Sequence, residues 1–421
     1  MISIPKKYYL VVNDRFELFF RGVIRMHNPY QYYVKAECVK GFTYNRYFTF
    51  TPTKEDIGEY ELSIIVYDDE GCIIEKKSTT LVVNEEVSPI RKLNVLCIGD
   101  SETVNGVWPY VGYSKFEGKY PDSLNFIGKM KKEQIGFEGY GGWQWKTFFD
   151  DEKESRTSEV WISCKHHLKE TDLNSIWMND EYEWVIDEIM PLRVKFRRGD
   201  SNTTVVNPVI SSIFKRMLNN ETLEVENYEY VNANPFYNPL TKELDFRYYL
   251  EKNNFPEPDL IFTFLTGNGL FLPFSKDFVH KEYAPKFLSK LASAFPNALI
   301  ATMGIELPCC NGGVTACYGA SGYYNDWYGY TITAFNYDEW LEDYTINSNL
   351  KDYLTYFDVK SQFDSEYNYP YILANVNNRS NIKERLGTNG LHPSLDGYQQ
   401  IGDAFYRLLV EMIKKYNKKN K

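Results

Sequence analysis

The sequence predicts an α/β protein with a doubly wound parallel sheet, preceded by a small all-β region. Two observations indicate the α/β part: short apolar runs typical of buried parallel strands, and helical segments between them. A third observation, a series of short alternating runs before residue 88, predicts the β region. The chain has 421 residues, which suits two or three domains.

The composition is that of a folded protein, with 43% hydrophobic and 25% charged residues. It excludes a disordered or fibrous chain. The formal net charge of −10 argues against nucleic-acid binding as the main function. No run approaches the roughly 18 apolar residues that a membrane-spanning helix needs, so we expect no membrane partner. The oligomeric state is left open.

We assign residues 1–88 to a β-sandwich accessory domain. The run 53–66 and the turn after it resemble the late strands of an immunoglobulin-like or cadherin-like module. This domain could bind carbohydrate, pack against the rest of the chain or space it from a partner. A polar linker is expected over 89–93. The expected strands are Tyr8–Val12, Phe16–Phe20, Tyr32–Val39, Tyr47–Phe50, Tyr60–Tyr67 and Ile73–Val83.

Residues 94–421 form the predicted α/β domain. The last element, from Leu395 to about Tyr416, has apolar residues at helical spacing and ends in lysines, as helix C-termini often do. The stretch of about 144–258 is too long for a plain crossover, so we interpret it as an insertion. It could be a lid or substrate-binding wall, or a surface extension. The expected strands are Leu93–Ile98, Leu124–Ile127, Leu260–Leu265, Ala298–Met303 and Tyr353–Val359.

Ser101 is the first candidate for chemistry. It ends the triplet Gly99-Asp100-Ser101 directly after an apolar strand, and ligands bind beyond the carboxyl ends of such strands. The same triplet recurs at 199–201, but polar sequence surrounds it. We therefore interpret the second copy as a turn.

His392 is the second candidate, in a loop just before the final helix. A loop there could carry the imidazole to Ser101. The other four histidines are interpreted as surface or packing residues: His27, His166, His167 and His280.

Two further segments supply hydrogen-bond donors at strand ends. Gly142 lies in a Gly-Gly-Trp sequence, where a backbone N–H can approach a ligand closely. Asn268 follows the strand at 260–265 and offers two amide hydrogens. Together with Ser101 and His392, these residues provide the groups that acyl transfer needs: a nucleophile, a general base and an oxyanion hole.

The chain from about 94 to 416 resembles the SGNH (GDSL-type) hydrolases. Ser101, Gly142, Asn268 and His392 match the four conserved blocks in order, and HPSLDGYQQIGDAF is similar to the usual continuation of the last block. The segment GYGGWQW is similar to the second block of carbohydrate-active acetylesterases in the family. The resemblance implies a flavodoxin-like three-layer α/β/α domain. It also implies an oxyanion hole made by Ser101, Gly142 and Asn268.

The sequence departs from the family pattern in two blocks. The third block usually reads Gly-x-Asn-Asp, and here Gly269 follows Asn268. The family's last block usually has an Asp three residues before the His, and here that residue is Asn389. An amide can orient an imidazole but does not stabilise imidazolium as a carboxylate does; in the serine-protease triad Asp→Asn lowers kcat about 10⁴-fold. We leave open whether Asn389, a backbone carbonyl, Asp364 or Asp396 orients His392.

The implied activity is that of a serine esterase on O-acyl, above all O-acetyl, esters of carbohydrate, with no cofactor and no metal. The alternative is a catalytically impaired carbohydrate-binding or virion or cell-surface module on the same fold. The loop 318–327 is rich in Gly and Tyr and could stack on sugar rings.

Seven cysteines in no regular spacing are expected as reduced thiols: Cys38, Cys72, Cys97, Cys164, Cys309, Cys310 and Cys317. The last three fit no zinc pattern. We expect no signal peptide at the start of this sequence. The compartment stays open among cytoplasm, export with a removed signal, and a phage particle.

Overall fold

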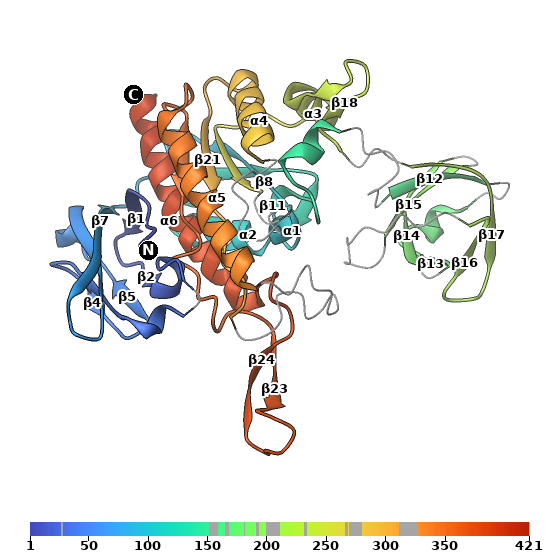
Figure 1. Cartoon of the computed structure of the whole chain (residues 1–421). Coiled ribbons are helices and arrows are strands. Elements are labelled where there is room, and N and C mark those ends of the chain that lie inside the picture. The colour runs from blue at the N-terminus through green and yellow to red at the C-terminus, as the bar shows by residue number, and fades with distance from the viewer. Residues whose placement is uncertain are drawn as a thin grey trace. The chain divides into compact units, whose positions relative to one another are not determined.

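A computed structural model describes residues 1–26, 28–150, 159–164, 168–180, 182–190, 193–198, 211–230, 234–265, 268, 280–310 and 327–420. The chain is a mixed α/β protein with two compact units, Met1–Gly139 with Asn254–Lys421, and Tyr140–Asn253. Figure 1 shows the elements of both units. Within the described residues, no helix combines the length and the apolar character needed to cross a bilayer.

Residues 1–84 form two sheets around one apolar core. The first sheet has the order β1-β7-β6-β3, with β1 parallel to β7. The second has the order β2-β5-β4 and is antiparallel. The bounds are β1 Lys7–Val11, β2 Phe16–Phe19, β3 Tyr33–Glu37, β4 Phe42–Thr43, β5 Tyr47–Phe50, β6 Gly58–Tyr67 and β7 Ile73–Asn84. Short 3₁₀ turns cover Phe20–Gly22, Pro29–Gln31 and Lys54–Asp56.

A seven-stranded sheet follows, in the order β10-β11-β8-β20-β21-β22, with β9 also paired to β8. All pairs are parallel except β10 with β11. The apolar runs of the sequence form β8, β20 and β21, whose residues are buried on both faces except Asn94. The bounds are β8 Leu93–Gly99, β9 Leu124–Ile127, β10 Met130–Lys132, β11 Ile135–Gly139, β20 Leu260–Phe264, β21 Leu299–Met303 and β22 Leu354–Phe357.

Helices α2 and α6 pack together against alternate residues of the central strands. Trp108 of α2 meets Phe405 of α6 edge to face at 4.7 Å, and both belong to the core that includes Val95 and Phe262. An antiparallel hairpin, β23 with β24, lies just before the His392 loop. The bounds are α1 Ser101–Val104, α2 Val107–Glu117, α4 His280–Ala294, α5 Trp327–Asn347, α6 Leu395–Lys419, β23 Tyr371–Asn375 and β24 Lys383–Gly387.

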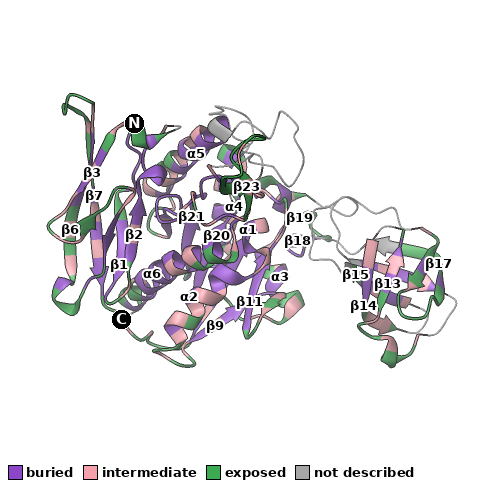
Figure 2. Ribbon diagram, turned by 90° about the horizontal axis from the view of Figure 1, so that it is seen from below, coloured by how far each residue is buried: buried purple, intermediate pink, exposed green. Residues whose placement is uncertain are grey.

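The β-rich region is joined to the α/β region by polar contacts as well as by packing, and both regions contain many buried residues (Figure 2). Asp14 accepts hydrogen bonds from Arg407 of α6 at 2.8 Å and from Lys115 of α2 at 2.5 Å. The hydroxyl groups of Tyr8, in β1, and Ser361 share a buried hydrogen bond at 2.8 Å. These contacts make residues 1–84 part of the same compact unit as the sheet.

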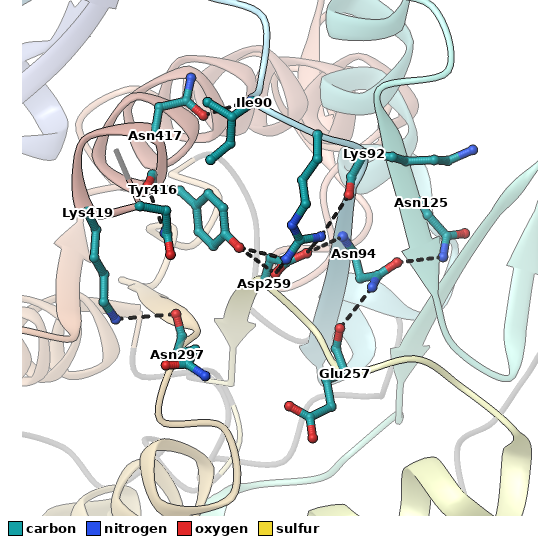
Figure 3. A network of polar contacts seen from close by, with 12 residues as sticks. Ile90, Lys92, Asn94, Asn125, Glu257, Asp259, Asn297, Tyr416, Asn417 and Lys419 are labelled. Carbon is teal, nitrogen blue, oxygen red and sulfur yellow. Dashed lines mark hydrogen bonds and ion pairs between the residues drawn. The ribbon is translucent and has the colours of Figure 1, made fainter.

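A second polar network fixes the segment that leads into β8 (Figure 3). Asp259 accepts two hydrogen bonds from the Arg91 guanidinium, at 2.5 and 3.0 Å. It also accepts from the Tyr416 hydroxyl at 2.8 Å and the Asn94 backbone N–H at 2.9 Å. Charge-assisted, two-pronged pairing of this kind holds both groups in one geometry. The network lies at the amino ends of β8 and β20, away from the edge where Ser101 follows β8.

The second unit contains a closed six-stranded barrel in the order β12-β15-β14-β13-β16-β17. The rings of Phe196 and Phe214 stack at 4.4 Å inside it, beside the buried Trp177 and Trp184. Outside the barrel, a smaller aromatic group surrounds Phe236. The bounds are β12 Glu159–Cys164, β13 Ile176–Asn179, β14 Tyr182–Met190, β15 Arg193–Arg198, β16 Ile213–Arg216, β17 Thr222–Tyr230, β18 Tyr237–Asn238, β19 Glu243–Leu244, α3 Phe246–Asn253, and 3₁₀ turns Trp145–Phe149 and Glu170–Asp172.

The six described cysteines are all free thiols: Cys38, Cys72, Cys97, Cys164, Cys309 and Cys310. Cys317, and all of the loop 318–327 except Trp327, lie outside the described residues. Trp327 is the first residue of α5.

Candidate functional site

Ser101 is the first residue of α1, two residues after β8 ends. The turn between them is tight. A Cβ added to Gly99 would lie 1.8 Å from Thr103 Oγ1 and 2.8 Å from the Phe264 carbonyl oxygen, so the position requires glycine. The Asp100 carboxylate accepts a hydrogen bond from the Glu102 backbone N–H at 3.1 Å, which caps α1. Together these contacts fix where the backbone presents Ser101.

Asn389 shapes the loop that carries His392. Its Oδ1 accepts from the backbone N–H groups of Leu391 and His392, both at 3.0 Å. Its Nδ2 lies 3.4 Å from His392 Nδ1. Because two backbone donors occupy the oxygen end, the amide nitrogen is the end that faces the imidazole.

This arrangement decides what Asn389 can do for the imidazole. An amide nitrogen only donates, so it pairs with His392 Nδ1 only in the tautomer whose proton is on Nε2. The tautomer in which Nε2 can take a proton from Ser101 carries its own proton on Nδ1, which an amide nitrogen cannot accept. In a Ser–His–Asp triad the carboxylate accepts a proton from Nδ1, which is the opposite arrangement. Asn389 therefore positions the loop and contacts the ring, but in this geometry it does not accept the Nδ1 proton.

A carboxyl group faces the other ring nitrogen. Glu102 Oε1 lies 3.7 Å from His392 Nε2, and the Glu102 side chain is only 6% exposed. Glu102 is the residue directly after Ser101. The contact therefore brings the His392 ring to the turn that presents Ser101.

Glu102 belongs to a buried acidic group with Asp100 and Glu306. Burial raises the pKa of Glu102 well above its usual range, and the neighbouring Glu306 and Asp100 carboxyls raise it further. A hydrogen bond from the Tyr398 hydroxyl works in the opposite direction. Burial likewise raises the pKa of Glu306 to about 8, with Asp100 and Asp338 adding to the effect.

The two described histidines both have lowered pKa values. Burial lowers the pKa of His392, which keeps the imidazole neutral and able to accept a proton near pH 7. Burial lowers the pKa of His280 to about 4, against an opposing contribution from an Asn268 backbone group. His280 begins α4 and packs edge to face on Tyr337 at 5.3 Å, so its interpretation as a packing residue is confirmed.

Asn268 is half-buried beyond the end of β20. Its amide nitrogen lies 3.4 Å from Asp100 Oδ2, in the residue before Ser101. The structure therefore brings Asn268 to the same turn as Ser101. The residues on either side of it, 266–267 and 269–279, lie outside the described part of the chain.

Gly142 belongs to the second compact unit. It has a φ of 75°, in the left-handed region that glycine adopts without strain. The Trp143 backbone N–H donates to the Tyr140 carbonyl at 3.1 Å, and the two rings stack at 4.3 Å. Trp143 is 2% exposed, so it is a packed side chain in this unit.

The other two acids that could orient His392 are placed as follows. Asp364 accepts a hydrogen bond from Arg46 Nη2 at 2.7 Å and one from the Glu366 backbone N–H at 3.1 Å. Asp396 is exposed in the first turn of α6.

Glu102 is a site residue that the sequence did not lead us to predict. The available signal was a carboxylate directly after the candidate nucleophile. Its direction depends on the turn at Asp100, which spacing alone does not give. The second Gly-Asp-Ser triplet and three histidines lie outside the described residues: residues 199–201, His27, His166 and His167.

No protein-family model matches the sequence, and no curated protein matches it. Comparison with solved structures gives matches to esterases at low identity. One is a mutant acetyl esterase with an acetate ion, with 12% identity, a TM-score of 0.34, and coverage of 76% of this chain and 98% of that one.

Two further matches are carbohydrate esterases. A family 3 enzyme from Talaromyces cellulolyticus has 12% identity and a TM-score of 0.35, covering 76% of this chain and 98% of its own. A family two enzyme from Cellvibrio japonicus has 10% identity and a TM-score of 0.29, covering 97% of this chain and 88% of its own.

Proposed function

We propose that this chain is an SGNH-type serine esterase that hydrolyses O-acyl esters, most readily O-acetyl esters on carbohydrate. The proposal includes a flavodoxin-like arrangement for the α/β region and an immunoglobulin-like sandwich for residues 1–88. It also includes Ser101 as nucleophile and His392 as general base.

The observation that carries the proposal is the contact between the His392 loop and the Ser101 turn. His392 Nε2 lies 3.7 Å from a side-chain oxygen of Glu102, the next residue after Ser101. Ser101 follows β8, and His392 immediately precedes α6. Residues almost 300 positions apart in the sequence thus meet where a sheet of this kind binds ligands.

In the proposed reaction, the Ser101 hydroxyl gives its proton to His392 as Oγ attacks the ester carbonyl. The Ser101 backbone N–H and the Asn268 amide donate to the oxyanion. The alcohol leaves with the proton from His392. Water then attacks the acyl-enzyme with His392 as base, and the acid is released.

The preference for acetylated carbohydrate is supported by the similarity of GYGGWQW to the matching block of carbohydrate-active acetylesterases. Screening acetylated xylan, acetylated pectin and O-acetylated sialic acids for released acetate separates the candidate sugars. Release from none of them, with p-nitrophenyl acetate still cleaved, would reject the carbohydrate preference but not the esterase.

A second candidate is a catalytically impaired binding module on the same fold. The observation that favours it is the Asn389 amide nitrogen facing His392 Nδ1 at 3.4 Å, where a triad would have a carboxylate. A folded protein that binds acetylated oligosaccharide without cleaving it would support this alternative.

The first test is p-nitrophenyl acetate hydrolysis by the wild type and Ser101→Ala. We expect the substitution to abolish turnover above the buffer rate while the circular dichroism spectrum is unchanged. The matched control is Ser88→Ala, because Ser88 is an exposed serine in the connecting segment and should keep the wild-type rate. Full activity in Ser101→Ala would reject Ser101 as the nucleophile.

A further inference from the structure

The position where the resemblance places the acid of a triad is occupied by Asn389. A proton taken from Ser101 leaves the imidazole positively charged, and the Asn389 amide nitrogen donates toward that ring instead of balancing its charge. If His392 is the base, another group near the ring must stabilise the imidazolium.

Glu102 meets the geometric requirements for that group. Its Oε1 is 3.7 Å from His392 Nε2, within ion-pair distance, and its side chain is 6% exposed, so water screens the pair little. The α1 turn holds the Glu102 backbone, because its N–H donates to Asp100 at 3.1 Å. The carboxyl itself is held by a hydrogen bond from the Tyr398 hydroxyl.

We propose that Glu102 is the acidic partner of His392, a positioning residue whose carboxylate orients the imidazole and stabilises the positive charge that it gains from Ser101. The inference rests on the proposed function. In the step, the Ser101 O–H bond breaks as the Oγ–carbon bond forms, the proton moves to the unprotonated Nε2 of His392, and the carbonyl oxygen becomes an oxyanion. Glu102 stays ionised throughout and neither gains nor loses a proton.

To stabilise the imidazolium, Glu102 must be ionised, and its surroundings shift that ionisation to higher pH. Burial and two neighbouring carboxyls raise the pKa of Glu102, whereas the Tyr398 hydroxyl lowers it. Esterase activity should therefore rise with pH as Glu102 loses its proton. The titratable groups that face Glu102 are Asp100, Glu306, Tyr330, Tyr369, His392 and Tyr398.

The experiment measures kcat/KM for p-nitrophenyl acetate between pH 5 and 9, corrected for buffer hydrolysis. We expect Glu102→Gln, which keeps the shape of the side chain and removes its charge, to lower the maximum kcat/KM about 100-fold. It should also remove the rise in kcat/KM with pH that reflects the ionisation of Glu102. Glu102→Asp should regain part of the rate, because it restores the charge on a shorter side chain. Wild-type rates and profile in Glu102→Gln, or a lower rate with an unmoved profile, would overturn the proposal.

A matched pair of variants tests the same point without changing Glu102. Tyr398→Phe removes a hydrogen bond to the Glu102 carboxylate, so the rise in kcat/KM that reflects Glu102 ionisation should move to higher pH. Glu306→Gln removes a neighbouring carboxyl, so the same rise should move to lower pH. If the rise stays in place in both folded variants, the proposal is wrong even where Glu102→Gln does not fold.

Ser101→Ala separates this inference from the proposed function. If the wild type has no turnover, or Ser101→Ala keeps it, the esterase assignment fails and the role of Glu102 fails with it. If Ser101→Ala is inactive while Glu102→Gln matches the wild type, only the role of Glu102 is wrong.

Discussion

At the scale of single residues, the candidate site combines a neutral histidine with protonatable carboxyl groups. Burial lowers the pKa of His392 and raises the pKa of Glu102, so each group is shifted toward its neutral form. Asn389 stabilises the His392 loop by accepting two backbone hydrogen bonds, and this structural role is clearer than any role in the reaction.

His280 provides a prediction about stability and pH. Its pKa is about 4 in the folded protein, whereas an exposed histidine has a pKa near 6.5. Between these values the unfolded chain binds a proton that the folded chain does not. The free energy of unfolding should therefore fall as pH drops from about 6.5 to about 4, by about 3 kcal/mol at most from this residue.

The measurement is urea unfolding at pH 7 and pH 5 for the wild type and His280→Leu. The variant lacks the titrating group, so its stability should fall less between the two pH values. An equal loss in both proteins would show that His280 does not contribute to the pH dependence.

At the scale of elements, loops from three parts of the chain support one another beside the site. Arg21, from the β-rich region, donates to the Pro308 carbonyl at 3.1 Å and to Ser365 Oγ at 2.6 Å. The next residue, Cys309, donates its N–H to the Gly390 carbonyl at 3.0 Å. Gly390 is two residues before His392, so Arg21 supports the loop that carries the histidine.

Arg21→Met should lower both stability and catalysis. The substitution leaves two buried acceptors without this donor, which costs about 1 to 3 kcal/mol. The His392 loop loses support, so kcat should fall a few-fold while KM changes little. Urea unfolding and p-nitrophenyl acetate kinetics measure the two effects.

Arg15→Met is the control for that prediction. Arg15 is 57% exposed and pairs with Glu17 at 2.7 Å on the surface, so its loss should change stability by less than about 0.5 kcal/mol. Equal effects of the two substitutions would mean that Arg21 has no special part in supporting the loop.

At the scale of the whole molecule, the chain has two compact units, and the first unites the β-rich region with the sheet. Gly22 lies at the junction inside the first unit: a Cβ there would be 2.2 Å from the Lys360 carbonyl oxygen and 2.4 Å from Ser361 Cα. The backbones of the two regions touch at this point, which makes the junction sensitive to a single methyl group.

Gly22→Ala should destabilise the whole first unit by about 1 to 3 kcal/mol, because the added methyl forces the two backbones apart. The loss should appear in one cooperative transition followed by Trp108 fluorescence in a single-tryptophan background. Gly118→Ala is the comparison, because its added Cβ would be 3.2 Å from the Ser114 carbonyl within the same segment. An unchanged midpoint for Gly22→Ala would contradict the tight junction.

Local patterns predicted the elements around the site better than the long-range pairing. The apolar runs at 93–98 and 260–265 and the helix from Leu395 are present, because buried strands and amphipathic helices leave clear local signals. The barrel of 159–230 was not predicted. Its strands pair out of sequence order, β12 with both β15 and β17, and a register shift interrupts β12 at Ser163.

In the candidate site too, residues that lie in local motifs could be predicted, whereas those that depend on tertiary geometry could not. The order of motifs predicted Ser101, Asn268 and His392 as candidates, and their roles stay predictions. Glu102 depends on a side-chain direction that a capped four-residue helix sets, and no local pattern encodes it.

The most direct test of the central claim is fluorophosphonate labelling of the folded protein, read by intact mass and peptide mapping. A serine activated by His392 should form one covalent adduct per chain, at Ser101, and Ser101→Ala should form none. A folded wild-type protein that takes up no label, or takes it up at another residue, would contradict the assignment of Ser101 as the activated nucleophile.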